Sequence, residues 1–304
     1  MKWTKLIAVC LLGVCCIVHF SDAADAAAEA EPAKVKVMIL DGQMKYKGHK
    51  WDETTPVMKQ ILDETGRFQV EVVTSPKRGE PNEDFQPDFS KYDVIVMNYE
   101  GDDWPEKTQK ALETYMAGGG GLVIVHAADN AFGTWQQWNE MIGFGGWGGR
   151  TEASGPMIWW QDGKIFRDTE TKGKGGTHGQ NADFLVTTRD PKHPIMKGLP
   201  EKWMHAKDEL YSKMRGPGKN MHVLATGWQS PDQRGTGKDE ICLFTVTYGK
   251  GRVFHTTFGH DTKSISCVGF IVTFQRGTEW AATGKVTLTE VPEDFPTETQ
   301  TSSR

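Results

Sequence analysis

Cysteine is scarce in this chain of 304 residues. Only five cysteines are present, three of them lie within the first sixteen residues, and no CxxC or CxxH spacing occurs beyond those three. This scarcity excludes a disulfide scaffold, a structural zinc knuckle and a c-type haem attachment site. The sequence leaves open whether the two remaining cysteines, Cys242 and Cys267, pair with each other or stay as buried thiols.

Runs of basic residues are also missing. The chain has 35 Lys and Arg against 40 Asp and Glu, a net charge of −5, and no basic run longer than two residues. Binding to duplex nucleic acid needs a concentrated basic surface, so we expect no nucleic acid partner. The glycine-rich stretch 145–150 lacks the Lys-Ser/Thr pair of a phosphate-binding loop, so we expect no nucleotide cofactor.

The apolar run at residues 6–20 is about 15 residues long, shorter than the roughly 20 that a membrane-spanning helix needs. Lys2 and Lys5 precede this run, and a stretch of mostly small residues follows it at 21–24. We therefore expect a cleaved signal peptide over residues 1–23, a secreted or periplasmic protein, and no transmembrane segment in the mature chain. Residues 24–34, rich in Ala and Glu, predict a flexible linker.

Apolar runs alternate with amphipathic stretches from residue 35 to residue 125. Short buried strands are expected at 35–40, 68–73, 92–97 and 122–125, and helices are expected to begin near Pro56 and Pro105. This alternation indicates an α/β fold with an open, mostly parallel sheet flanked by helices. Ligands of such sheets bind beyond the carboxyl ends of the strands, which points to residues 41–49, 98–104 and 126–130.

The second half is rich in loops and glycine between residues 143 and 238. Strands are expected at 221–226, at 240–248 and, after a hairpin turn, at 253–257. An apolar helix over about 264–282 closes a single domain that spans residues 35–284. The segment 285–304 is rich in Pro, Glu, Thr and Ser and predicts a disordered C-terminal tail.

Two phrases carry a resemblance to a known family. Residues 119–128 read GGGLVIVHAA and residues 248–260 read YGKGRVFHTTFGH, with GGTHG at 175–179 and DELY at 208–211 between them. In this order the phrases resemble the ThuA-like family, which is named for trehalose utilisation and is related in fold to the class I glutamine amidotransferases. The resemblance covers about residues 35–284 and implies a flavodoxin-like sheet and a role in carbohydrate metabolism.

The resemblance also suggests where chemistry takes place. In an amidotransferase a nucleophilic cysteine occupies the strained turn after the central strand, where this chain has His126 and no Cys, Ser or Thr nearby. Glutamine hydrolysis through a thioester is therefore excluded. His260 follows the late hairpin, where an amidotransferase has its catalytic histidine. We expect His126 and His260 to face one cleft with Glu209 and to act as catalytic residues, although His126 could instead only order its turn.

Six further residues are predicted to bind substrate because they follow strands or lie in the family phrases. They are His49, Trp104, Asp129, His178, Asp208 and Asp261. Histidine also ligates metals, so binding of a divalent cation is an alternative role for the pair His126 and His260, and for His49 or His178. The chain has 11 tryptophans, and sugars stack on such rings, so a small carbohydrate is the expected ligand.

Three functions compete at this stage. The first is an enzyme that acts on a keto-sugar or oxidised glycoside, in which a base removes the acidic C–H beside the ketone and elimination, hydrolysis or isomerisation follows. The second is a non-catalytic module that binds sugar or a partner. The third is a two-carboxylate glycosidase, which would pair Glu209 with Asp129 or Asp261 across a cleft.

Overall fold

The computed structural model describes Met1 and residues 33–304. The expected signal peptide (1–23) and nearly all of the expected linker (24–34) lie outside the described residues. Residues 34–304 form one unit, to which all of the following applies.

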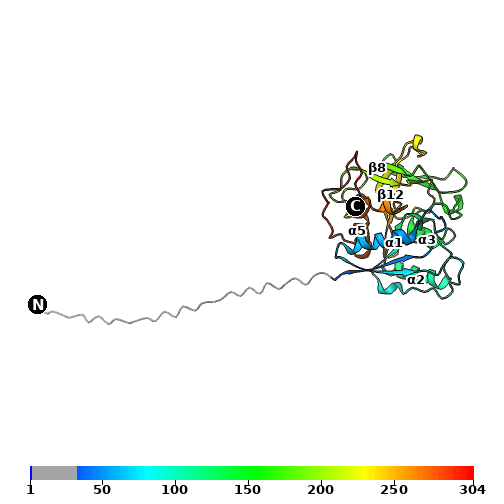
Figure 1. The fold of residues 1–304 in the computed structure, drawn as a ribbon, viewed down its shortest axis with the longest axis horizontal. Coiled ribbons are helices and arrows are strands. Elements are labelled where there is room, and N and C mark those ends of the chain that lie inside the picture. The colour runs from blue at the N-terminus through cyan, green and yellow to red at the C-terminus, as the bar shows by residue number, and fades with distance from the viewer. Residues whose placement is uncertain (2–32) are drawn as a thin grey trace. The chain divides into compact units, whose positions relative to one another are not determined.

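Figure 1 shows the course of the chain through this unit, coloured by residue number. Its mixed sheet has nine strands in the order β2-β1-β3-β4-β13-β12-β11-β8-β9. The first five strands in that order are mutually parallel, and the remaining four extend the sheet antiparallel to their neighbours. The predicted α/β class is confirmed, and the loop-rich second half of the chain supplies the antiparallel strands. The nine strands are β1 (Val35–Asp41), β2 (Phe68–Thr74), β3 (Val94–Met97), β4 (Gly121–Val125), β8 (Ala182–Thr188), β9 (Lys202–Asp208), β11 (Met221–Trp228), β12 (Glu240–Tyr248) and β13 (Gly251–Thr256).

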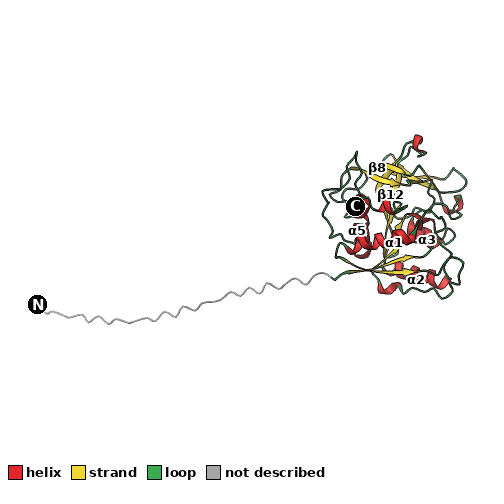
Figure 2. Ribbon diagram, viewed as in Figure 1, coloured by secondary structure: helices red, strands yellow, loops and turns green. Residues whose placement is uncertain are grey.

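Helices cover both faces of the sheet, as Figure 2 shows in red beside the yellow strands. Alternate residues of each parallel strand point to opposite faces, so Val37 packs on one side and Met38 on the other. The Val37 face is covered by α1 (Trp51–Asp63) and α5 (Val268–Thr283), and the Met38 face by α2 (Glu106–Gly118) and α3 (Gln136–Ile142). The hydrophobic core therefore forms two layers, and polar side chains gather at the strand ends.

The remaining elements are short. They are α4 (Thr262–Ile265), the hairpin β5 (Met157–Gln161) and β6 (Lys164–Asp168), the two-stranded ribbon β7 (Thr177–His178) and β10 (Tyr211–Ser212), and the 3-10 turns Phe89–Lys91, His126–Asn130, Glu152–Ser154 and Pro231–Gln233. No helix in the described residues is both long and apolar enough to cross a membrane. Cys242 and Cys267 are buried free thiols rather than a disulfide.

Two helix boundaries differ from the sequence prediction. The first helix begins at Trp51 and carries Pro56 inside it, on its exposed side. The carbonyl that Pro56 leaves without an N–H donor can therefore be hydrated, and the acidic residues Asp52 and Glu53 favour a start one turn earlier. The predicted helix at 264–282 is two helices, because the chain turns at Cys267, the N-cap of α5.

The prediction of a disordered tail over residues 285–304 was wrong. The buried Arg276 of α5 donates hydrogen bonds to the backbone carbonyls of residues 288, 289 and 290, and Glu279 accepts from the backbone of residues 287 and 288. Phe295 is buried, and Thr297 accepts a hydrogen bond from the backbone of β9. The tail is therefore held by hydrogen bonds between side chains of α5 and the backbone of the tail. Amino-acid composition does not reveal such bonds.

Candidate functional site

The site lies where strands of the sheet end. His49 is in the loop after β1, Glu100 follows β3, His126 follows β4 and His260 follows β13. The carboxyl ends of these parallel strands share one edge of the sheet. Glu209 comes directly after the edge strand β9, and the preceding residue, Asp208, accepts hydrogen bonds from the backbone after the central strand β13. These bonds bring the end of β9 beside the end of β13.

His126 begins the turn after β4 in a strained conformation. Its φ is +44°, in the left-handed region that non-glycine residues rarely occupy. Gly259 lies against it, and a Cβ on that glycine would come within 2.9 Å of Val125 and 3.4 Å of His126. The Nδ1 of His126 is 2.7 Å from the carbonyl of Thr257, so Nδ1 carries the proton and donates it. The unprotonated Nε2 is thereby left free to bind a ligand.

Three imidazoles form a compact cluster. The ring centroids of His49 and His126 are 5.0 Å apart, those of His49 and His260 are 5.0 Å apart, and those of His126 and His260 are 5.5 Å apart. Both ring nitrogens of His49 and the Nε2 of His126 are buried with no hydrogen-bond partner among the described residues. Buried nitrogens without partners are costly, which favours a ligand between them.

Glu209 supplies the negative charge of the cluster. Its carboxylate oxygens lie 3.2 Å from Nδ1 of His260, 3.6 Å from Nδ1 of His178 and 3.9 Å from Nε2 of His126. Burial opposes ionisation of Glu209, but the hydrogen bond and positive charge of His260 outweigh it and lower the pKa of the carboxyl. The pKa of His126 is lowered by burial and by its histidine neighbours, so its imidazole is neutral at neutral pH, as metal binding requires.

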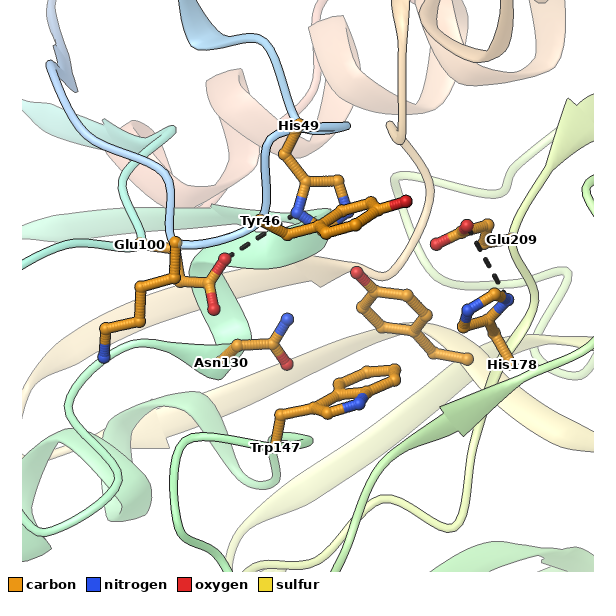
Figure 3. Close-up of a pocket in the computed structure, with 9 residues that line it drawn as sticks. Tyr46, His49, Glu100, Asn130, Trp147, His178 and Glu209 are labelled. Carbon is orange, nitrogen blue, oxygen red and sulfur yellow. Dashed lines mark ion pairs between the residues drawn. The ribbon is translucent and has the colours of Figure 1, made fainter.

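A cavity of about 410 Å³ opens beside the cluster (Figure 3). His49 and Glu209 line it, whereas His126 and His260 border a small recess on the inner side of His49. In Figure 3, Glu100 lies beside His49 on one side and His178 beside Glu209 on the other. The other lining residues are Lys45, Tyr46, Asn130, Trp147 and Tyr211. The cavity thus has a polar inner end and an aromatic wall.

The structure brings five of the predicted site residues together, namely His49, His126, His178, Glu209 and His260. It does not bring Trp104, Asp129 or Asp261 to the cavity. Trp104 is buried in the apolar layer, with its ring centroid 4.9 Å from that of Phe132. Asp129 is fully buried against His255, and Asp261 caps α4 by accepting from the backbone of Lys263 and Ser264.

Asp208 is a positioning residue and does not line the cavity. Its carboxylate is fully buried and accepts from Nε2 of His205 at 2.9 Å. It also accepts from the backbone N–H groups of Glu209 at 2.8 Å, Gly259 at 2.8 Å and His260 at 3.2 Å. One carboxylate thus fixes the backbone of two members of the cluster.

Sequence reasoning missed five lining residues, which are Lys45, Tyr46, Glu100, Asn130 and Tyr211. All five lie in segments that were singled out, either after a strand or in the DELY phrase, so position was the available signal. Glu100 reaches the site because its backbone N–H donates to the carbonyl of Gln43, which extends β3 beside the loop that carries His49. Of the tryptophans considered for sugar stacking, only Trp147 lines this cavity.

The cluster fits a divalent metal. One ligand atom from each of His49, His126, Glu209 and His260 lies within 4.8 Å of the others. In a tetrahedral site with bonds of about 2.1 Å, the ligand atoms are about 3.4 Å apart, so side-chain shifts of about 1 Å would close the site. Imidazole with carboxylate suits Zn²⁺ and related transition metals. The hydrogen bond from His126 Nδ1 to a backbone carbonyl is the arrangement that orients metal-binding histidines.

Fold and site define an α/β protein in which a histidine, and no nucleophilic side chain, stands on the strained turn of the central strand. The chain belongs to the ThuA family, described as trehalose utilisation, whose family model matches residues 36–281. A ThuA-like protein from Parabacteroides merdae is 46% identical, with 90% of this chain and 98% of that chain covered and a TM-score of 0.85.

A second ThuA-like structure, from Bacteroides uniformis, shares the fold. It is 17% identical, with 87% of this chain and 99% of that chain covered and a TM-score of 0.58. A comparison with curated proteins gave no match. Membership of the family supports a role related to carbohydrate and agrees with the resemblance in the sequence phrases.

Proposed function

We propose that this protein is an enzyme that acts on a keto-sugar or an oxidised glycoside by removing a proton next to the ketone. The observation that carries the proposal is the cluster of His49, His126, His260 and Glu209 at the inner end of an aromatic-walled cavity. A binding module needs aromatic and hydrogen-bonding groups but has no use for buried imidazoles without partners.

Binding of the sugar is assigned to the outer part of the cavity. The ring centroid of Trp147 is 4.9 Å from that of Tyr211 and 6.1 Å from that of His178, so the indole forms a wall next to the polar groups. Gly176 allows this packing, because a Cβ there would come within 2.5 Å of the Trp147 backbone. Asn130 also lines this part of the cavity.

A divalent cation held by the four clustered residues would stabilise the negative charge that develops on the ketone oxygen. Removal of the substrate proton beside the ketone is assigned to His178. Its Nδ1 donates to the carbonyl of Gly179 at 2.7 Å, so Nε2 can accept a proton, and its side chain is one-third exposed toward the cavity. Glu209, 3.6 Å from Nδ1, stabilises the imidazolium that forms.

The proposed reaction is an elimination, in which a proton and the glycosidic oxygen leave adjacent carbons. His178 takes the proton from the carbon beside the ketone, and the electron pair forms a double bond to the adjacent anomeric carbon. The glycosidic C–O bond then breaks, and the leaving oxygen takes up a proton, in the simplest case the one that His178 carries. No oxidant or reductant is consumed. The two-carboxylate alternative loses support because neither Asp129 nor Asp261 faces the cavity.

Two variants test this division of roles. His178→Ala should lower turnover of a keto-disaccharide by about 10²–10⁴-fold and leave metal content unchanged. Glu209→Gln should lower both turnover and metal content, because Glu209 is proposed as a metal ligand. His222→Ala is the matched control, because His222 is an exposed histidine paired with Asp190 and should retain full activity. Full activity in the His178 variant would contradict the role of His178 as the base. Full activity in both variants would contradict the mechanism as a whole.

We further propose that the protein is exported, on the basis of the lysines and apolar run in residues 1–23. N-terminal sequencing of protein from its native host tests this point. A start near Ala24 is expected, and an intact Met1 would contradict the proposal.

A further inference from the structure

A second cavity, of about 540 Å³, lies apart from the candidate metal centre. The β5–β6 hairpin, the β7–β10 ribbon and the loop that leads into β12 form its walls. Its volume is within the range of about 300–1,000 Å³ that is typical of small-molecule sites. None of the residues in the proposed mechanism lines it.

Its walls are strongly basic. Lys172, Lys174, Lys213, Arg234 and Lys238 all line the cavity, and no ion pair joins any of them to a carboxylate within residues 33–304. Lys238 is held in place by Trp159, since its Nζ lies 3.4 Å from the centroid of the indole ring. Five cations around one hollow repel each other, and they do so in a protein with a net charge of −5.

The acidic residues of this cavity do not cancel that charge. Asp168, which accepts from the hydroxyl of Thr171 and from the backbone N–H groups of residues 170 and 171, is ionised and offsets only one of the five positive charges. Burial raises the pKa of Glu240 to about 7, and the hydroxyl of Thr236 donates to it, so it is partly neutral at neutral pH. An excess of positive charge therefore remains for an external ligand.

The β7–β10 ribbon contributes side chains to both cavities. Thr177 pairs with Ser212 and His178 pairs with Tyr211 in the antiparallel β7–β10 ribbon. Neighbouring residues of a strand point to opposite faces, and accordingly Thr177 lines the second cavity while His178 lines the first. Lys213 follows the end of β10 with a φ of +54°, and its side chain also lines the second cavity.

We propose that the second cavity binds an acidic saccharide through a carboxylate or sulfate ester held by Lys213, Arg234 and Lys238. The guanidinium of Arg234 suits the paired oxygens of such groups, and the two ammonium groups add charge without fixed geometry. The anionic part of this assignment follows from the cavity alone. That the anion belongs to a sugar rests on the proposed function alone.

The test is calorimetric titration of the full protein at low ionic strength. The probes are a disaccharide that carries a uronic acid, a sulfated disaccharide, a neutral disaccharide of the same size, and inorganic sulfate. Lys213→Ala with Arg234→Ala removes two of the cations. Lys202→Ala with Arg78→Ala is the matched control, because it removes the same charges from two exposed side chains that do not line the cavity.

At least one acidic disaccharide should bind about tenfold more tightly than the neutral sugar and inorganic sulfate, and more weakly as salt is raised. The Lys213/Arg234 variant should lose about tenfold in affinity and the control less than twofold. Thermal unfolding checks that the variant is folded, and Arg234→Ala alone replaces it if it is not.

Equal affinity for neutral and acidic sugars, or no loss in the variant, would overturn the proposal. Inorganic sulfate binding as tightly as the acidic sugars would overturn the saccharide assignment. The titration repeated on Glu209→Gln should give unchanged affinity, so a failure of the proposed mechanism is distinguishable from a failure of this site.

Discussion

Replacement of Asp208 by alanine should destabilise the protein strongly, although Asp208 touches no cavity. Its fully buried carboxylate accepts from His205 and from the backbone N–H groups of residues 209, 259 and 260. A buried donor without a partner costs about 1–3 kcal/mol. Water that enters the vacated space will recover part of this, so we expect the free energy of unfolding to fall by at least about 4 kcal/mol, near the lower end of the sum for four donors.

Urea denaturation followed by circular dichroism measures the effect. Asp208→Asn keeps one acceptor oxygen and should lose less than the alanine variant. Asp63→Ala is the control, because Asp63 is exposed and forms only an i,i+4 pair with Lys59, so its loss should be below about 0.5 kcal/mol. A loss under about 1 kcal/mol in Asp208→Ala would refute the view that this carboxylate holds the cluster together.

Three further predictions concern the cluster and the second cavity. The folded-state pKa of Glu240 is about 7, above its ordinary value of 4.5, so its contribution to stability is lost as pH rises. The wild type should therefore lose about 3 kcal/mol between pH 4.5 and 7 relative to Glu240→Gln, and a difference that does not change with pH would contradict this. The free energy of unfolding of His126→Gly should be about 1 kcal/mol higher than that of His126→Ala, since glycine tolerates the positive φ. Equal stability of the two variants would argue against strain at His126. Zn²⁺ at 100 times its Kd should stabilise the wild type by about 2.7 kcal/mol, or about 5–10 °C in Tm, and leave Glu209→Gln unchanged; an equal shift in both proteins would place the metal elsewhere.

The parallel half of the fold could be predicted because β1, β3 and β4 are almost entirely buried and each forms a short apolar run. The same logic pointed to His49 and His126, since each follows a strand whose carboxyl end is fixed at one edge of the sheet. His178, Glu209 and His260 were reached through the family phrases, because no local pattern shows that β9 ends near β13.

Contacts between distant segments account for what was missed. Trp104 follows a strand in sequence but packs into the apolar layer against Phe132, which only the folded loop determines. Asp208 and Glu209 are adjacent and acidic, yet one is a buried acceptor for backbone N–H groups and the other faces the imidazoles. The C-terminal segment has a disorder-like composition but is held by Arg276 and Glu279 of α5.

The most direct test of the central claim is turnover of a matched pair of disaccharides that differ only by a ketone on the ring. The purified protein is incubated with the 3-keto sugar and with its ordinary parent, with and without a metal chelator, and products are followed by NMR. We predict that only the keto-sugar is converted and that the chelator stops the conversion. Binding of both sugars without conversion of either would contradict the account and leave the protein as a sugar-binding module.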